Sequence, residues 1–157
     1  MFVTQNGKAI TVKKFFSRET SIRIDISANP SQIWSLLTRA SDYPIWNSTV
    51  ISIVGSIAMG EEILLKSTLD SKRTFKLKVK DFEENKRLVW GDAMGNRTFT
   101  IVPIENGITF SMVEKIGGPL FPLFASMIPS FDSSFEQFAS DLKKIAEKHC
   151  NYSPEKK

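Results

Sequence analysis

The feature that most constrains this chain is a series of six strand-like segments between Thr49 and Ile116. Apolar and polar side chains alternate along the segments, and short turns rich in Gly, Asn, Asp and Lys separate them. The expected strands are Val50–Ile57, Glu61–Leu69, Arg73–Phe82, Arg87–Met94, Arg97–Ile104 and Ile108–Ile116. Such short turns join neighbouring antiparallel strands, so the pattern predicts an antiparallel meander with one apolar face.

The apolar face of such a sheet needs a cover, and the C-terminal part of the chain supplies a candidate. Large apolar side chains recur there every three or four residues, as on one face of a helix. The stripe consists of Phe121, Phe124, Met127, Ile128, Phe131, Phe135, Phe138, Leu142 and Ile145. We expect a long helix from about Pro119 to about Lys148, kinked or broken at Pro129 because proline cannot continue the hydrogen-bond ladder.

The N-terminal third adds one strand and one clear helix. Ser21–Ser27 alternates isoleucine with polar residues, which is typical of a half-buried strand. Asn29 is a good N-cap, Pro30 suits the first helical position and Gln32 completes a capping box, so we expect a helix from about Pro30 to Ala40. Ser41–Ser48 is expected to form a loop or a second short helix. The predicted fold class is α+β.

The turns also predict the register of the last three strands. Two-residue turns at Gly95-Asn96 and Asn106-Gly107 would place six apolar side chains on one face: Leu88, Trp90, Phe99, Ile101, Phe110 and Met112. The same register would align Asp92, Phe99 and Glu114 in one row, with the two acids roughly 10 Å apart. We expect Arg97 to point to the other face.

Length and charge indicate one domain with basic ends. The chain has 157 residues and a net charge of +4, of which +3 lies before Ser21 and +1 after His149. We therefore expect a single domain over residues 20–149, a basic N-terminal extension over residues 1–19 and a C-terminal tail over residues 150–157. Because the charges of the domain itself cancel, nucleic acid is not an expected partner.

Several kinds of chemistry have little support in the sequence. His149 and Cys150 fall short of a zinc ligand set, and we expect no metal and no cofactor. A single histidine near a helix end gives little support to a nucleophile with a base. The chain has neither 18 consecutive apolar residues nor a secretory signal, so we expect a cytoplasmic protein without stable membrane insertion. The sequence leaves its oligomeric state open.

Three stretches resemble the START-related (SRPBCC) superfamily, and within it the polyketide cyclase/dehydrase-like branch. The first, SIRIDISANPSQIWSLLTRASDYPIWNSTV, is similar to the opening strand, the P-x-x-[IV]-W helix and the Y-P-x-W-N turn of the family. The second, RLVWGDAMGNRTFTIVPIENGITFSMVEKIGGPL, is similar to the paired strands that lead through G-P-L into the last helix. The third, FEQFASDLKKIAEK, is similar to the end of that helix. Together they cover roughly residues 20 to 149, and none is a catalytic signature.

The resemblance implies a helix-grip fold, in which a curved antiparallel sheet wraps around a long C-terminal helix and two short helices follow the first strand. It also implies a deep, largely apolar cavity between the sheet and that helix. Any helix packed on a sheet needs an apolar stripe, so many of these side chains would be core. The candidate lining residues are Tyr43, Trp46, Phe75, Leu77, Val79, Trp90, Phe99, Ile101, Phe110, Met112, Phe124, Met127, Ile128, Phe131 and Phe135.

Three functions remain open at this point. The first is a carrier or sensor that binds a small hydrophobic or aromatic molecule in the cavity. The second is an enzyme resembling the cyclases or aromatases of the superfamily, with Asp92 or Glu114 as general acid or base, although a solvated rim carboxylate is the simpler interpretation of each. The third is a protein-interaction or chaperone-partner domain. The fold by itself does not choose among them.

Overall fold

The predicted meander forms the larger part of one antiparallel sheet. The computed structural model describes residues 6–151, and the side chains of residues 6–148. Its eight strands follow the order β1-β2-β8-β7-β6-β5-β4-β3. They are β1 (Ile10–Lys13), β2 (Ser17–Ile26), β3 (Val50–Val54), β4 (Glu62–Ser67), β5 (Asp70–Glu83), β6 (Arg87–Gly91), β7 (Gly95–Ile104) and β8 (Gly107–Gly117).

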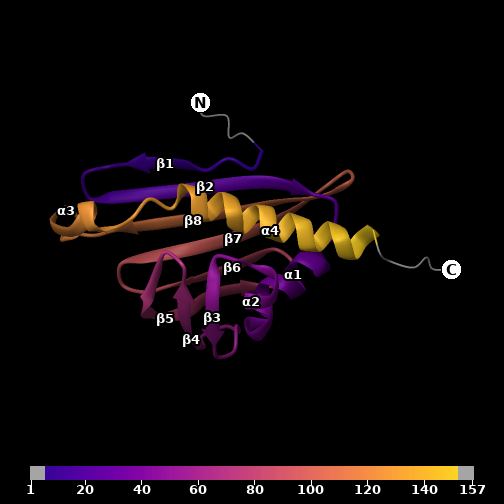
Figure 1. Cartoon of the computed structure of the whole chain (residues 1–157), viewed down its shortest axis with the longest axis horizontal. Helices are drawn as coiled ribbons and strands as arrows, with labels where there is room; N and C mark the ends of the chain where they lie inside the picture. The colour runs from indigo at the N-terminus through magenta and orange to yellow at the C-terminus, as the bar shows by residue number, and fades with distance from the viewer. Residues whose placement is uncertain (1–5, 152–157) are drawn as a thin grey trace.

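Helices lie against one side of this sheet and at its ends. They are α1 (Pro30–Thr38), η1 (Ala40–Asp42), α2 (Tyr43–Trp46), α3 (Phe121–Phe124), η2 (Ala125–Met127) and α4 (Asp132–Asn151). In Figure 1, α4 runs between the β2–β8 part of the sheet and α1 with α2, while α3 lies at the opposite end from the C-terminal turn of α4. The predicted α+β class, with a curved antiparallel sheet and a long C-terminal helix, is confirmed.

The start of α1 follows from its capping residues. The Asn29 side chain accepts a hydrogen bond from the Gln32 amide at 2.9 Å, and the Gln32 side chain accepts one from the Asn29 amide at 3.0 Å. Pro30 occupies the first turn, where its missing N–H costs nothing. The predicted capping box is therefore confirmed, and the helix ends at Thr38, two residues before the predicted end.

The predicted register of β6, β7 and β8 is wrong, although the apolar side chains lie on the predicted face. Trp90 lies opposite Arg97 rather than Ile101, and Phe99 lies opposite Met112 rather than Glu114. The β6–β7 turn forms at Ala93-Met94, because Asp92 Oδ1 accepts the amides of Met94 and Gly95 at 2.9 and 3.1 Å. Both pairings differ from the prediction by an even number of residues, so the apolar side chains keep their face.

Arg97 is also misplaced by the sequence prediction. Arg97 and Phe99 are two positions apart in the same strand, so both side chains point to the same, apolar face. The cross-strand row therefore contains Trp90, Arg97 and Glu114, not Asp92, Phe99 and Glu114. Glu114 acquires a basic neighbour that the expected register did not provide.

The fold includes most of the residues assigned to an N-terminal extension. β1 pairs with β2, and β2 begins at Ser17, so the boundary expected at residue 20 falls inside a strand. The amide of Ala9 donates to Glu136 at 3.0 Å, and the Thr11 hydroxyl donates to Asp132, which ties this hairpin to α4. Residues 1–5 and 152–157 of the expected extension and tail lie outside the described residues.

The predicted break in the C-terminal helical region is confirmed. After α3 and η2, the backbone of Ile128 is extended, Pro129 follows, and α4 begins at Asp132. The long helix is therefore α4 alone, and it starts 13 residues after Pro119, where the sequence placed the earliest start. Residues 128–131 form a separate connection between the two helical parts, which we call the α3–α4 connection.

Phe138 of α4 lies at the centre of the core. Its ring is 1% exposed and contacts the rings of Phe99 and Phe110 on the sheet, with centroids 5.9 and 6.3 Å away. It also contacts Tyr43 and Trp46 of α2, at 6.3 and 5.8 Å. One side chain thus joins α4, the sheet and α2.

Replacing Phe138 with alanine should lower the free energy of unfolding by about 3–5 kcal/mol, because the cavity left at the meeting point of three elements cannot collapse from one side. Urea unfolding followed by circular dichroism measures the change. Phe15→Ala, at a side chain that is 73% exposed, is the control and should change the value by no more than about 0.5 kcal/mol. Similar losses in the two variants would contradict this account of the core.

Candidate ligand-binding site

Most of the predicted cavity residues pack against one another in the interior. Trp90 and Phe99 meet edge to face with centroids 4.9 Å apart, and Phe99 lies 6.2 Å from Phe110. These rings therefore contact one another directly in the core. The members of the predicted set that are at most 9% exposed are Tyr43, Trp46, Leu77, Val79, Trp90, Phe99, Ile101, Phe110, Met112 and Phe135.

The remaining predicted residues lie nearer the surface. Phe75, Phe124, Ile128 and Phe131 are partly buried, whereas Met127 is 77% exposed. The fifteen residues thus divide into an interior group and a group nearer the surface. Ile128 is the member of the set that lines the pocket described next.

A pocket of about 540 Å³ lies between the β1–β2 hairpin and the segment that joins β8 to α4. We call it the hairpin pocket. One wall comes from β1, its turn and the start of β2, and the other from α3, η2 and the α3–α4 connection. Its lining residues are Thr11, Lys13, Lys14, Phe15, Ser17, Arg18, Phe121, Pro122, Ala125, Ser126, Ile128, Ser130 and Asp132.

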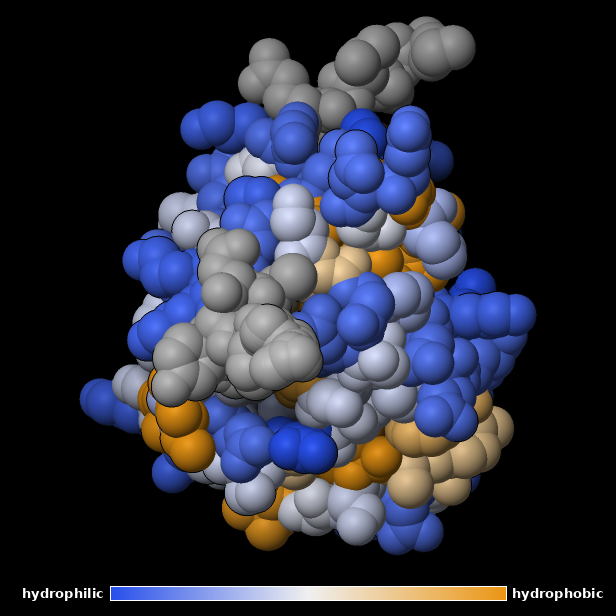
Figure 2. Space-filling model, turned by 90° about the vertical axis from the view of Figure 1, so that its right-hand side faces the viewer, coloured by the Kyte–Doolittle hydropathy of each residue, from blue (hydrophilic) through white to orange (hydrophobic). Residues whose placement is uncertain are grey.

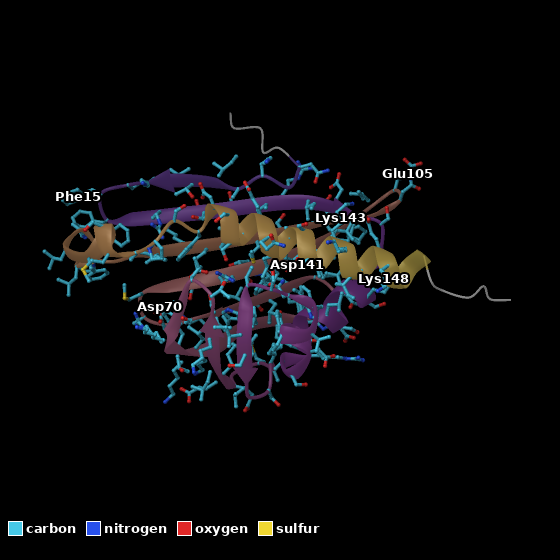
Figure 3. The ribbon with its side chains drawn as sticks, viewed as in Figure 1. Phe15, Asp70, Glu105, Asp141, Lys143 and Lys148 are labelled. Carbon is cyan, nitrogen blue, oxygen red and sulfur yellow. The ribbon has the colours of Figure 1, made fainter. Side chains whose placement is uncertain are left out.

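Sequence reasoning missed half of this pocket because it treated residues 1–19 as an extension. The signal was present in ITVKKFFSR, where two apolar β-branched residues at alternate positions precede two phenylalanines. Figure 3 places Phe15 at the end of the molecule that carries α3, next to the helical segment of the opposite wall.

Arg18 holds the two walls together. Its guanidinium donates to the carbonyl oxygens of Ile128 and Pro129, at 3.2 and 2.8 Å, and lies 4.7 Å from the centre of the Phe131 ring. Burial lowers the pKa of Arg18, and the negative charges of Asp132 and Glu114 act in the opposite direction. A residue of β2 thus fixes the α3–α4 connection against the sheet edge.

A line of cations and rings leads from the hairpin pocket towards the interior. Phe131 stacks on Phe135 with centroids 6.1 Å apart, and the guanidinium of Arg97 lies 5.0 Å from the Phe135 ring. Arg97 Nε donates to Glu114 Oε1 at 2.6 Å, and the two side chains are 15% and 19% exposed. This pair brings full charges to an apolar face, where each charge depends on the other.

The two candidate acids therefore have structural partners. The Asp92 carboxylate closes the β6–β7 turn through two backbone amides, and the Glu114 carboxylate pairs with Arg97. Neither acid lines the hairpin pocket. A role as general acid or base needs a free carboxyl group within reach of a bound substrate, and these contacts do not provide it.

Tyr43 and Trp46 differ in how their polar atoms are satisfied. The Tyr43 hydroxyl donates to the Leu37 carbonyl oxygen at 2.7 Å, and burial raises its pKa while the charge of Arg97 acts in the opposite direction. Nε1 of Trp46 is buried and has no hydrogen-bond partner within the part of the chain that the structure describes. A buried indole N–H without an acceptor is costly, so its environment suits a small molecule with an oxygen acceptor.

A second pocket, of about 500 Å³, lies where the end of α1 and η1 approach β3 and the loop that follows it. Its lining residues are Thr38, Ala40, Ser41, Ile53, Val54, Gly55, Ser56, Ile57 and Ala58. None of these side chains carries a charge. The hairpin pocket has the more varied chemistry, with rings and hydroxyls on both walls, three basic side chains on the hairpin wall and Asp132 on the opposite side.

The described residues hold neither a metal-binding cluster nor a membrane span. Among them, no group of three or more His, Cys, Asp or Glu side chains could hold a metal ion. No helix in the same part of the chain is long and apolar enough to cross a membrane. The side chains of His149 and Cys150 lie outside the described residues.

Comparison with solved structures identifies the fold. A START superfamily protein from Mycobacterium smegmatis matches with a TM-score of 0.60 and 17% identity, over 83% of this chain and 97% of that one. The chain shares the helix-grip fold of this protein. The protein MLL2253 from Mesorhizobium loti matches with a TM-score of 0.63 and 20% identity, over 83% and 98% of the two chains.

A third similar structure is the di-domain ARO/CYC StfQ from the steffimycin biosynthetic pathway. It matches with a TM-score of 0.63 and 10% identity, over 87% of this chain and 52% of StfQ. No family model matches this sequence, and no curated protein matches it. At identities this low, the structural likeness shows the fold alone and leaves the ligand to be argued from the site.

Arg97→Met should lower the free energy of unfolding by about 1–3 kcal/mol, because it leaves the Glu114 carboxylate on an apolar face without its partner. Chemical denaturation measures this, and adding Glu114→Gln to Arg97→Met should restore part of the loss. Arg87→Met breaks an exposed ion pair with Asp81 and serves as the control, with a change within about 1 kcal/mol. A double variant no more stable than Arg97→Met would contradict the coupling.

Proposed function

We propose that this chain binds a small amphipathic molecule, with an apolar body and an anionic or strongly polar group, in the hairpin pocket. The binding is reversible, and the protein serves as a carrier or sensor. The observation that carries the proposal is the pocket itself, in which phenylalanine rings and basic side chains line one space of about 540 Å³. That volume lies within the range of about 300–1,000 Å³ that small-molecule sites occupy.

The lining divides the pocket into an apolar and a polar part. Phe15 from the hairpin turn and Phe121 from α3 offer ring surfaces to an apolar body. Lys13 and Lys14 are exposed at the rim and suit a carboxylate, sulfonate or phosphate group. Arg18 is already engaged with two carbonyl oxygens and a ring, so it shapes the wall instead of supplying a free cation.

The fold is consistent with this proposal without specifying it. The superfamily that the sequence resembles hosts carriers, enzymes and regulators, so the pocket and not the fold decides the argument. Catalysis by Asp92 or Glu114 is not part of the proposal, because both carboxylates have structural partners outside the hairpin pocket.

Filling the hairpin pocket should abolish binding of an anionic aromatic probe. We expect 8-anilinonaphthalene-1-sulfonate to bind with one-to-one stoichiometry, and Ser126→Trp to weaken its binding at least about tenfold because the indole occupies the pocket. Fluorescence titration measures the affinity. Ser140→Trp places the same side chain at an exposed position of α4 outside the lining and should leave the affinity within about twofold. Equal affinities in the two variants would refute the site.

A second candidate site lies in the interior, where the sequence predicted the cavity between sheet and helix. The observation that favours it is the unpartnered indole N–H of Trp46, which an oxygen acceptor of a bound molecule would satisfy. Tyr43, Trp90 and Phe138 supply the surrounding aromatic surface. A ligand there would be an apolar molecule with a carbonyl or hydroxyl oxygen.

Native mass spectrometry of the purified protein separates the two sites through any small molecule that it retains. If the hairpin pocket holds the molecule, Ser126→Trp should lose it and Trp46→Phe should keep it, because the second substitution changes no residue of that pocket. The reverse pattern would assign the ligand to the interior, since Trp46→Phe removes the only hydrogen-bond donor invoked there. Thermal unfolding of both variants controls for loss of the fold.

A further inference from the structure

Six large apolar side chains are exposed at the end of the molecule that carries α3. Three of them, Phe15, Leu123 and Met127, are 73%, 77% and 77% exposed. We call the group the apolar tip, and its members are Phe15, Phe16, Met94, Leu120, Leu123 and Met127. Single exposed apolar residues are ordinary, but several gathered on one end of a small domain indicate an interaction surface.

The members of the apolar tip come from three separate segments that backbone contacts bring together. The amide of Gly118 donates to the carbonyl oxygen of Phe16 at 3.0 Å, which joins the β1–β2 turn to the end of β8. The amide of Gly117 donates to the carbonyl oxygen of Met94 at 2.9 Å, which adds the β6–β7 turn. Figures 1 and 3 place α3 and Phe15 together at this end.

The opposite end of the molecule has a different surface. Figure 2 views that end, where hydrophilic side chains predominate and hydrophobic ones form small separate patches. Exposed apolar residues outside the apolar tip include Ile45 on α2 and Val102 on β7, which are 82% and 54% exposed. Because they belong to other elements than the members of the apolar tip, Ile45 and Val102 serve as control positions for substitutions in the tip.

The exposed charged side chains next to Phe15 are basic, whereas Asp132, an acid that lines the hairpin pocket, accepts a hydrogen bond from the Thr11 hydroxyl. Residues 10–18 and 117–131 contain three basic side chains and no acidic one. Lys13 and Lys14 are exposed, whereas Arg18 is buried. Glu19 alternates with the buried residues Arg18 and Thr20, so it points to the other face of the sheet. Asp92, beside Met94, is engaged by the amides of its own turn.

We propose that the apolar tip docks this protein reversibly on an anionic lipid bilayer. Phe, Leu and Met side chains next to exposed lysines are the composition of surfaces that lie in the headgroup region of such bilayers. The apolar side chains enter the boundary between headgroups and acyl chains, and Lys13 and Lys14 meet anionic headgroups. Docking is a proposal separate from ligand binding, because it rests on side chains that are exposed in the structure without a ligand.

The docked orientation would face the hairpin pocket towards the bilayer. Phe15 belongs both to the apolar tip and to the pocket lining, and α3 and η2 contribute to both. This step rests on the proposed function: in this orientation the amphipathic ligand passes between the bilayer and the pocket. The position of the tip thus gives the proposed carrier a route to its cargo.

Sedimentation with vesicles tests the docking. We use phosphatidylcholine vesicles with and without 30% phosphatidylserine, and we expect the full chain to bind the anionic vesicles more tightly. Phe15→Ser/Leu123→Ser should lower the partition coefficient about tenfold or more, because two apolar side chains no longer enter the bilayer. The matched control, Ile45→Ser/Val102→Ser, should stay within about twofold of the parent. Lys13→Gln/Lys14→Gln should lower binding to anionic vesicles about tenfold.

Lower binding of a variant could also result from unfolding, so a second experiment uses tryptophan fluorescence, in which docking produces a new signal. Leu123→Trp should shift its tryptophan emission to shorter wavelength on anionic vesicles, whereas Ile45→Trp should not. Equal partition of the two serine double variants, equal shifts of the two tryptophan variants, or no binding of the parent to either vesicle would overturn the proposal. None of these results bears on probe binding to the hairpin pocket in solution, so the two proposals fail separately.

Discussion

The structure depends on the packing of α4 against the apolar face of the sheet, and Phe138 is the centre of that contact. An antiparallel sheet with one apolar face is stable only when that face is covered. Phe99 and Phe110 present rings to α4, and Phe138 meets both while it also contacts Tyr43 and Trp46. Because one ring joins three elements, the helix, the sheet and α2 are positioned together.

The hairpin pocket and the apolar tip both lie at the end of the molecule that carries α3. Pro129 stops the helical segment, and Arg18 holds the resulting connection against the sheet edge through two carbonyl oxygens. The connection, α3, η2 and the β1–β2 hairpin line the hairpin pocket, and exposed side chains of the hairpin turn, the α3–η2 segment and the β6–β7 turn form the apolar tip. The interruption of the helical region at residues 128–131 thus contributes to the candidate ligand site and lies beside the candidate membrane surface.

One ion pair lies on the apolar face of the sheet. Arg97 and Glu114 face each other across β7 and β8, and the Arg97 guanidinium also covers the Phe135 ring. A lone acid at this position would carry a large desolvation cost, which is the reason that Glu114 first suggests an acid or base in catalysis. The partner changes that interpretation, because a paired carboxylate on a strand has a structural explanation.

The sequence by itself determined the strand alternation, the faces of the sheet, the capping box at Asn29 and the break at Pro129, because each depends on neighbours within a few residues. Tertiary structure decided the pairing of Arg97 with Glu114, since the turn residues allowed more than one register of the same parity. It also decided the hairpin pocket, where Arg18 reaches carbonyl oxygens 110 and 111 residues away. Contacts that distant depend on how the whole chain closes, and no local pattern encodes them.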